Sequence, residues 1–147
     1  QVPGTRFNFD FWPHNIPRRS TWPACRAVIA AERQAAGAGE RMVLAIQQAY
    51  YLEAKNPADE EVLVALSEGL ELDTGQLRED LTGTAVRAEL DEHFRLRDQL
   101  GAQGFPSLIL NSGSRFWPVP IHYREASAML AVIEDALAHQ AASDRRP

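Results

Sequence analysis

The chain has 147 residues, of which 45% are hydrophobic and 24% are charged, and its net charge at pH 7 is −5. This length and composition are typical of one soluble globular domain that buries a real core. The negative charge argues against general nucleic-acid binding, and no apolar run approaches the roughly 20 residues that a membrane helix needs. We therefore expect neither a nucleic acid nor a membrane among the partners.

Metal and disulfide chemistry have few side chains to draw on. The one cysteine, Cys25, can form neither an internal disulfide nor a thiolate metal site by itself. Its position beside Val28 and Ile29 on an apolar face predicts a packed side chain rather than a nucleophile. The four histidines lack the i, i+4 spacing of a helical metal pair. We predict no bound metal.

The first 19 residues are rich in proline and aromatic side chains. Phe7, Phe9 and Phe11 alternate with a period of two, which predicts an edge strand or an extended arm. Pro13 ends this segment.

Helix signals dominate from residue 20 onward. Ser20 or Thr21 can cap a first helix, and Pro23 stands in its first turn, where the missing N–H is harmless. Gly37 and Gly39 are expected to close this helix. Its apolar face is predicted to hold Cys25, Val28 and Ile29.

Four further helices are predicted before residue 104. The second runs from about Gly39 to Lys55, and the Asn56-Pro57 pair breaks it. Its apolar face is predicted to hold Val43, Ile46 and Tyr50.

Asp59 can cap a third helix, and Asp73 with Gln76 three residues on resembles a capping box that opens a short fourth helix. Thr84 opens a fifth helix, which ends near Gly101 or Gly104. The apolar stripes are Val62, Leu63, Leu66 and Leu70 in the third helix, and Val86, Leu90 and Phe94 in the fifth.

The pattern changes after Gly104. "FPSLIL" is typical of a strand, "NSGS" of a turn and "RFWPV" of a second strand, which together predict a β-hairpin. A last helix is predicted from about Tyr123 to Gln140, followed by a tail. Its predicted face holds Ala126, Leu130, Ile133 and Leu137.

So small a sheet has too few partners. Two short strands are marginally stable unless something else pairs with them or covers them. Either the hairpin pairs with a second copy, or a piece of sheet that belongs before Gln1 is absent from the chain. We favour the second explanation.

Three stretches, taken in order, carry a family resemblance. They are "STWPACRAVIAAERQ" (20–34), "AIQQAYYLEAKNPADEEVLVALSEGLELD" (45–73) and "LRDQLGAQGFPSLIL" (96–110). In this order they resemble the DsbA-like branch of the thioredoxin superfamily, specifically the bacterial predicted protein-disulfide isomerases.

The resemblance implies an α/β thioredoxin-like fold with a helical insertion domain. This chain would be mostly α with a C-terminal β-hairpin and helix, and would lack the N-terminal β-α-β half. The implied division is an arm or edge strand at 1–19, the helical insertion at 20–83, the C-terminal thioredoxin half at 84–140 and a tail at 141–147.

In the family, the N-terminal half carries the Cys-x-x-C active site, and this sequence contains no Cys-x-x-C. The resemblance therefore implies a portion of a thiol-disulfide oxidoreductase or protein-disulfide isomerase. The intact protein would act on peptide or small-thiol disulfides, and the chain as given would be inactive. No catalytic residue is predicted within it.

The proline after Phe105 is the residue of the chain that the resemblance marks as functional. In the family this proline is cis and faces the active-site cysteines. Gly104, Phe105 and Pro106 are therefore implied to form a substrate-docking loop. Trp12, Trp22, Tyr50, Tyr51 and Trp117 could line a peptide groove, but we predict that they fill the interface between the insertion and the thioredoxin core.

Two other functions stay open. One is a non-catalytic helical interaction module that pairs its sheet edge with a partner or a second copy. The other is a kappa-type glutathione-dependent isomerase or transferase, in which a serine replaces the first cysteine; glutathione would then be the cofactor, and otherwise none is predicted. We expect a cytoplasmic protein, with the periplasm as the alternative.

Overall fold

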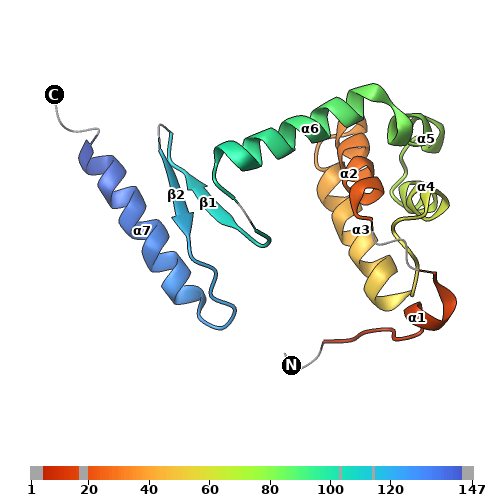
Figure 1. Cartoon of the computed structure of the whole chain (residues 1–147), viewed down its shortest axis with the longest axis horizontal. Coiled ribbons are helices and arrows are strands. Elements are labelled where there is room, and N and C mark those ends of the chain that lie inside the picture. The colour runs from red at the N-terminus through yellow and green to blue at the C-terminus, as the bar shows by residue number, and fades with distance from the viewer. Residues whose placement is uncertain (1–4, 17–19, 103, 114, 144–147) are drawn as a thin grey trace. The chain divides into compact units, whose positions relative to one another are not determined.

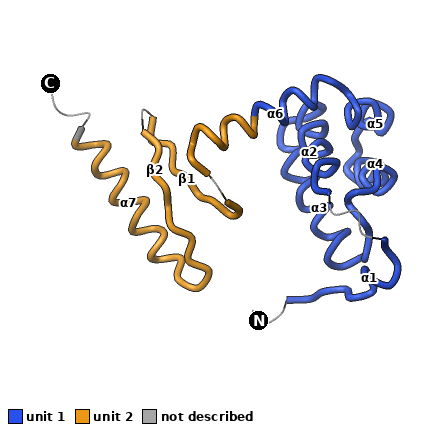
Figure 2. The backbone as a smooth tube through the Cα atoms, viewed as in Figure 1, with its two compact units in different colours: residues 1–92 blue, residues 93–147 orange. Residues whose placement is uncertain are grey.

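The computed structural model describes residues 5–16, 20–102, 104–113 and 115–143. Within them, six helices precede a β-hairpin and one helix follows it (Figure 1), and the chain divides into two units, residues 1–92 and residues 93–147 (Figure 2). The elements are α1 (Phe11–His14), α2 (Trp22–Gln34), α3 (Ala38–Leu52), α4 (Glu60–Gly69), α5 (Thr74–Thr82), α6 (Thr84–Gln99), β1 (Leu108–Asn111), β2 (Phe116–Val119) and α7 (Ala126–Ser143).

Residues 5–16 form an arm and a short helix rather than an edge strand. The Asn8 N–H donates to the Tyr51 carbonyl at 2.7 Å, and the rings of Phe7 and Tyr51 meet edge-on with centroids 5.7 Å apart. Phe11 opens α1 and is buried, with its ring centroid 4.7 Å from that of Tyr50. The alternating phenylalanines therefore pack on α3, because the described residues offer them no neighbouring strand.

Small side chains form the contact between α2 and α3, which lie side by side (Figure 1). The buried residues are Ala27, Ile29, Ala30 and Ala31 in α2, and Ala38, Gly39, Met42 and Ala49 in α3. The predicted faces were partly wrong, since Cys25, Val28, Ile46 and Tyr50 are only half-buried and Val43 is exposed. The reason is that alanines let two helices approach closely, so the contact follows the small residues instead of the large ones.

The two glycines that were expected to close α2 belong instead to the start of α3. Gly37 is the N-cap of α3 with a φ of +76°, and Gly39 lies buried in its first turn. The Glu32 carboxylate accepts the N–H groups of Gly37 at 3.1 Å and Gly39 at 2.9 Å. A Cβ at position 39 would lie 3.0 Å from Glu32 Oε2 and 3.2 Å from the Val28 carbonyl oxygen, so a larger residue there would crowd this cap.

The predicted cap at Asp73 is confirmed, but another helix completes it. Asp73 Oδ1 accepts the Gln76 N–H at 2.9 Å. In a full capping box the Gln76 side chain would return to the Asp73 N–H. Here Gln34 of α2 does so: its Oε1 accepts the Asp73 N–H at 2.8 Å and its Nε2 donates to the Asp73 carbonyl at 3.0 Å. The end of α2 is thereby held to the start of α5.

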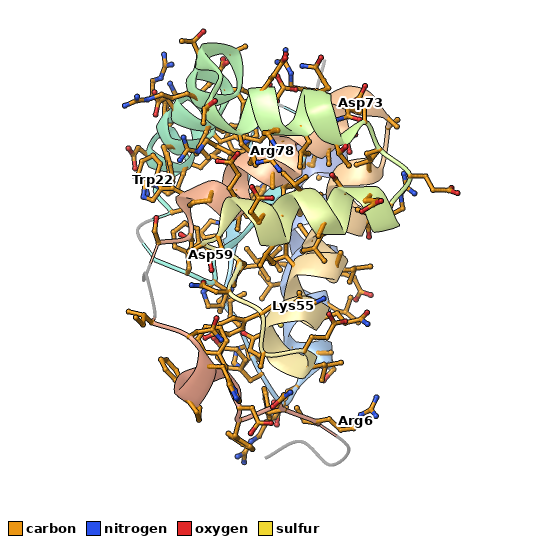
Figure 3. All side chains as sticks on the ribbon, turned by 90° about the vertical axis from the view of Figure 1, so that its right-hand side faces the viewer. Arg6, Trp22, Lys55, Asp59, Asp73 and Arg78 are labelled. Atoms are coloured by element: carbon orange, nitrogen blue, oxygen red, sulfur yellow. The ribbon has the colours of Figure 1, made fainter. Side chains whose placement is uncertain are left out.

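The other predicted caps are weaker. Thr21 and Asp59 stand at the N-cap positions of α2 and α4, without a side-chain cap hydrogen bond. Between α4 and α5, the Arg78 side chain of α5 donates two hydrogen bonds to Glu61 of α4, at 2.6 and 2.8 Å; Arg78 is labelled in Figure 3. Both side chains are exposed, so this pair contributes little to stability.

Unit 2 contains the predicted hairpin. β1 and β2 pair antiparallel, from Leu108 opposite Val119 to Asn111 opposite Phe116. Helix α7 contacts β2 and begins later than the predicted Tyr123.

The predicted apolar face of α7 was partly wrong. Leu130 and Leu137 are 55% and 48% exposed, whereas Ala136 is buried. A sheet of two strands is too narrow to cover the whole apolar surface of a helix this long. The predicted domain boundaries stay a prediction, and residues 144–147 of the predicted tail lie outside the described residues.

We predict that Glu32→Gln lowers the stability of the folded chain at pH 7. The N–H groups of Gly39 and Gly37 lower the pKa of Glu32 below its ordinary value. A depressed folded pKa means that the carboxylate stabilises the fold above its unfolded pKa of about 4.3, and that this contribution is lost as the pH falls through the folded pKa. Urea midpoints should therefore differ between wild type and variant at pH 7 and converge near pH 3. Glu68→Gln, at an exposed position on α4, is the matched control and should change neither midpoint.

We predict unequal costs for two glutamine substitutions. Gln34→Ala removes both hydrogen bonds to Asp73 and should lower the free energy of unfolding by about 1–2 kcal/mol. Gln76→Ala keeps the backbone N–H that Asp73 accepts and should be nearly neutral. Equal effects in urea denaturation would contradict the cap described above.

Candidate functional site

The end of α6 sets the course of the loop that leads into β1. Gly101 has a φ of +70°, a conformation that glycine adopts without a Cβ clash. The Gly101 N–H donates to the Asp98 carbonyl and the Ala102 N–H to the Arg97 carbonyl, both at 3.0 Å. These hydrogen bonds end α6, and the chain then continues into the loop that leads to β1.

The three residues predicted to dock substrate lie in this loop. The Phe105–Pro106 peptide bond is cis, and the Phe105 side chain is 81% exposed. The Ser107 hydroxyl donates to the Gly104 carbonyl at 2.5 Å, which closes the loop around Phe105 and Pro106. Phe105 is thus presented to solvent directly before the strand begins.

The register of the hairpin decides which sheet edge is open. The Ser112 N–H donates to the Arg115 carbonyl at 3.0 Å, so these two residues form a hydrogen-bonded pair. Hydrogen-bonded and non-hydrogen-bonded pairs alternate along an antiparallel ladder. Counting back from Ser112–Arg115, the Asn111–Phe116 pair is non-hydrogen-bonded, Leu110–Trp117 is hydrogen-bonded, and Ile109–Pro118 is again non-hydrogen-bonded.

Residues in such pairs direct their backbone groups away from the partner strand. On β2 one of these outward positions is Pro118, which has no N–H to donate, so that edge is poorly suited to a further strand. On β1 the backbone groups that point away from β2 belong to Ile109 and Asn111, and each of these residues has both an N–H to donate and a carbonyl to accept a hydrogen bond. The free edge of β1, which begins just after Pro106, is the one that can pair with another strand. Sequence reasoning missed this asymmetry, although a proline within the predicted second strand was a usable signal.

Two cavities flank the loop. One has a volume of about 330 Å³, and Pro106, Leu108, Pro118 and Ile121 are among its lining residues, none of which is charged. The other, of about 380 Å³, lies between the end of α6 and β1, and includes His93, Arg97 and Ser107. The first suits an uncharged extended segment, and the second has at its margin the Arg97 guanidinium, which pairs with Asp98 at 2.6 Å.

Cys25 is not part of this loop. It is half-buried on α2 in unit 1, whereas Pro106 belongs to unit 2. Burial raises the pKa of the Cys25 thiol, and its backbone hydrogen bond only partly opposes that effect. A raised pKa makes a thiol a poor nucleophile at neutral pH, which supports the prediction that Cys25 is not a nucleophile.

Other chemistry finds little support in the described part of the chain. No group of three or more His, Cys, Asp or Glu side chains within it could hold a metal ion. Among the described helices, none combines the length and apolar character needed to cross a bilayer.

Comparisons with known proteins match nearly the whole chain. Residues 3–115 match the sequence profile of a family described as thioredoxin. A candidate protein disulfide isomerase from Nitrosomonas europaea is similar in structure, with a TM-score of 0.76, 23% identity, and coverage of 92% of this chain and 67% of that one.

The cytosolic disulfide reductase DsbM from Pseudomonas aeruginosa is also similar. It has a TM-score of 0.72 and 28% identity, and the structure of the same reductase with GSH has a TM-score of 0.71 and 26% identity. Both matches cover 92% of this chain and 69% of the reductase.

We predict that Cys25 reacts slowly with iodoacetamide in the folded chain. Because burial raises the pKa of Cys25, the pH midpoint of alkylation should lie above the ordinary value of about 8.5. The same chain unfolded in urea is the control and should show the ordinary midpoint. A midpoint near or below neutral pH would mean an activated thiol and would contradict the packed role.

Proposed function

Because the chain belongs to the thioredoxin family, in its DsbA-like branch, we propose that its α6–β1 loop docks the substrate of a thiol-disulfide exchange. The observation that carries the proposal is the position of Phe105, exposed at the mouth of a strand whose outer edge is free. The 28% identity to a disulfide reductase supports the reaction class.

The exchange needs two thiols besides the substrate. A thiolate attacks one sulfur of the substrate disulfide, forms a mixed disulfide and releases the other substrate sulfur as a thiolate. A second thiol then attacks the mixed disulfide and frees the remaining substrate sulfur, which leaves the two attacking sulfurs joined. The chain has one cysteine, so in this proposal both attacking thiols belong to a Cys-x-x-C segment outside the 147 residues. The chain by itself is then inactive and serves as the docking half.

The substrate is an extended peptide in this proposal. A peptide that pairs with the Phe105 backbone gains main-chain hydrogen bonds, the usual source of affinity in strand addition. The uncharged cavity beside Pro106 then accepts an apolar side chain next to the substrate disulfide. The free edge of β1 is left to a strand of the thiol-bearing segment or of a second copy.

Glutathione disulfide is the second candidate substrate, because the Pseudomonas reductase was solved with GSH. Its carboxylates have one candidate partner beside the loop, the Arg97 guanidinium between α6 and β1, for which they would compete with Asp98. By analogy with that cytosolic reductase, we place the activity in the cytoplasm. A glutathione conjugation assay on protein that includes the thiol-bearing segment separates the kappa-type alternative from disulfide exchange.

We predict that Phe105→Pro weakens docking more than Phe105→Ala. The proline variant loses the backbone N–H at this position, while the alanine variant keeps it. The probe is the disulfide-linked dimer of an acetylated, amidated Ala-Cys-Ala peptide, titrated into the ¹⁵N-labelled chain. The wild type should show a shift of the Ser107 amide, and the proline variant should have a Kd about three- to tenfold higher.

Oxidised glutathione serves as the parallel probe. If only oxidised glutathione moves the Ser107 amide, the second candidate replaces the first. If neither probe does so, or if both Phe105 variants lose binding equally, the backbone-docking proposal fails.

A further inference from the structure

A second uncharged cavity lies in unit 1, where the N-terminal arm, the start of α2 and the end of α3 meet. Its volume is about 490 Å³, within the range of small-ligand pockets. The residues used below are Phe11, Trp12, Ala24, Tyr50, Tyr51 and Asn56, all of which line it. The proposed docking loop shares none of them.

Aromatic rings dominate the lining. The ring centroids of Phe11 and Tyr50 are 4.7 Å apart, those of Tyr50 and Tyr51 4.9 Å, and those of Phe11 and Trp12 5.3 Å. Trp12 and Tyr51 are 56% and 46% exposed, so part of this ring cluster is open to solvent. Offset and edge-to-face contacts are the arrangements that aromatic rings prefer with one another, and a further ring could extend the cluster.

No charged side chain lines the cavity, although 24% of the chain is charged. Burying a charge without a partner is strongly unfavourable. The cavity therefore selects against charged ligands. The cavity beside Pro106 also lacks charged lining residues, so both suit the same class of uncharged peptide segment.

Asn56 adds one polar contact. Its side chain is buried, with 5% of the residue exposed, and Oδ1 accepts the Ala58 N–H at 3.0 Å. This bond fixes the orientation of the amide. Within the described part of the chain, the Nδ2 group makes no hydrogen bond. Because Asn56 lines the cavity, this donor is available to a ligand that brings an acceptor, such as a peptide carbonyl.

We propose that this cavity binds an uncharged aromatic side chain of a peptide, with the adjacent peptide carbonyl accepting a hydrogen bond from Asn56 Nδ2. The inference goes beyond the proposed function, because it concerns a cavity within unit 1 and does not require the loop of unit 2 to dock a substrate. A peptide supplies the ring and the carbonyl together, whereas a simple arene supplies only the ring.

The test compares two peptides on the full 147-residue chain. Acetylated, amidated Ala-Phe-Ala should move the amide signals of Ala24 and Tyr51 in ¹⁵N-resolved spectra. The same peptide with lysine in place of phenylalanine should bind at least about tenfold more weakly, because its charge finds no counterion. Equal affinity for the two peptides would overturn the proposal. So would binding of toluene at these residues without binding of the phenylalanine peptide, which would mark a small-molecule site.

Two variants sharpen the result. Ala24→Leu fills the cavity and should raise the Kd at least about tenfold, while Ala88→Leu, at an exposed position of α6, should leave it unchanged. Asn56→Asp keeps the acceptor for the Ala58 N–H and removes the donor, and should also weaken binding. An unchanged Kd in a folded Ala24→Leu variant would overturn the proposal, and if that variant does not fold, the peptide comparison decides.

The cystine peptide separates this inference from the proposed function. If the cystine peptide moves the Ser107 amide but the phenylalanine peptide does not reach the cavity, only the side-chain preference fails. If the cavity fills but Ser107 does not respond, only the docking loop fails.

Discussion

The arrangement of unit 1 depends on the last turn of α2, where three consecutive side chains reach three other helices. Glu32 holds the start of α3, Gln34 holds the start of α5, and Arg33 forms an ion pair with Glu89 of α6 at 3.2 Å. The ion pair is exposed and contributes little. The other two contacts satisfy backbone N–H groups that the helix starts would otherwise leave unpaired. They fix where α3 and α5 begin relative to α2, and the buried alanines of α2 and α3 can then meet.

In the described residues of unit 2, no comparable set of side-chain contacts holds one element to the start of another. Its hairpin has one edge interrupted by Pro118 and another that keeps its donors and acceptors, while Phe116 is 53% exposed. The loop with Phe105 precedes the open edge, so substrate docking and completion of the sheet would both occur along β1. In the proposed exchange the docked peptide must meet attacking thiols, so docking next to the edge that can take up a further strand would bring the peptide close to any thiol carried there.

The sequence predicted those features whose cause lies within a few residues. Asn56-Pro57 ends a helix, Asp73 caps one, and the hairpin follows from local strand and turn signals. The sequence could not predict that Gln34 completes the Asp73 cap, because Gln34 is distant in sequence and no local pattern distinguishes it from other glutamines. The buried faces of α2 and α3 were misjudged for a related reason: apolar periodicity favours large side chains, whereas close helix packing here uses alanine. The proposed docking loop was predicted only through family resemblance, since a Phe-Pro pair before a strand says little by itself.

The proposed function assigns recognition and reactivity to separate segments, and there is a physical reason for such a division. A cavity that accepts apolar peptide segments has to exclude charge and water, and the same surroundings oppose the formation of a thiolate. Cys25 illustrates the conflict, because the burial that makes it a good packing residue also raises its pKa. An attacking thiolate needs instead a helix N-terminus or a nearby cation at a partly exposed position. A division in which the described chain supplies uncharged binding surfaces, and a separate segment supplies the thiols, satisfies both requirements at once.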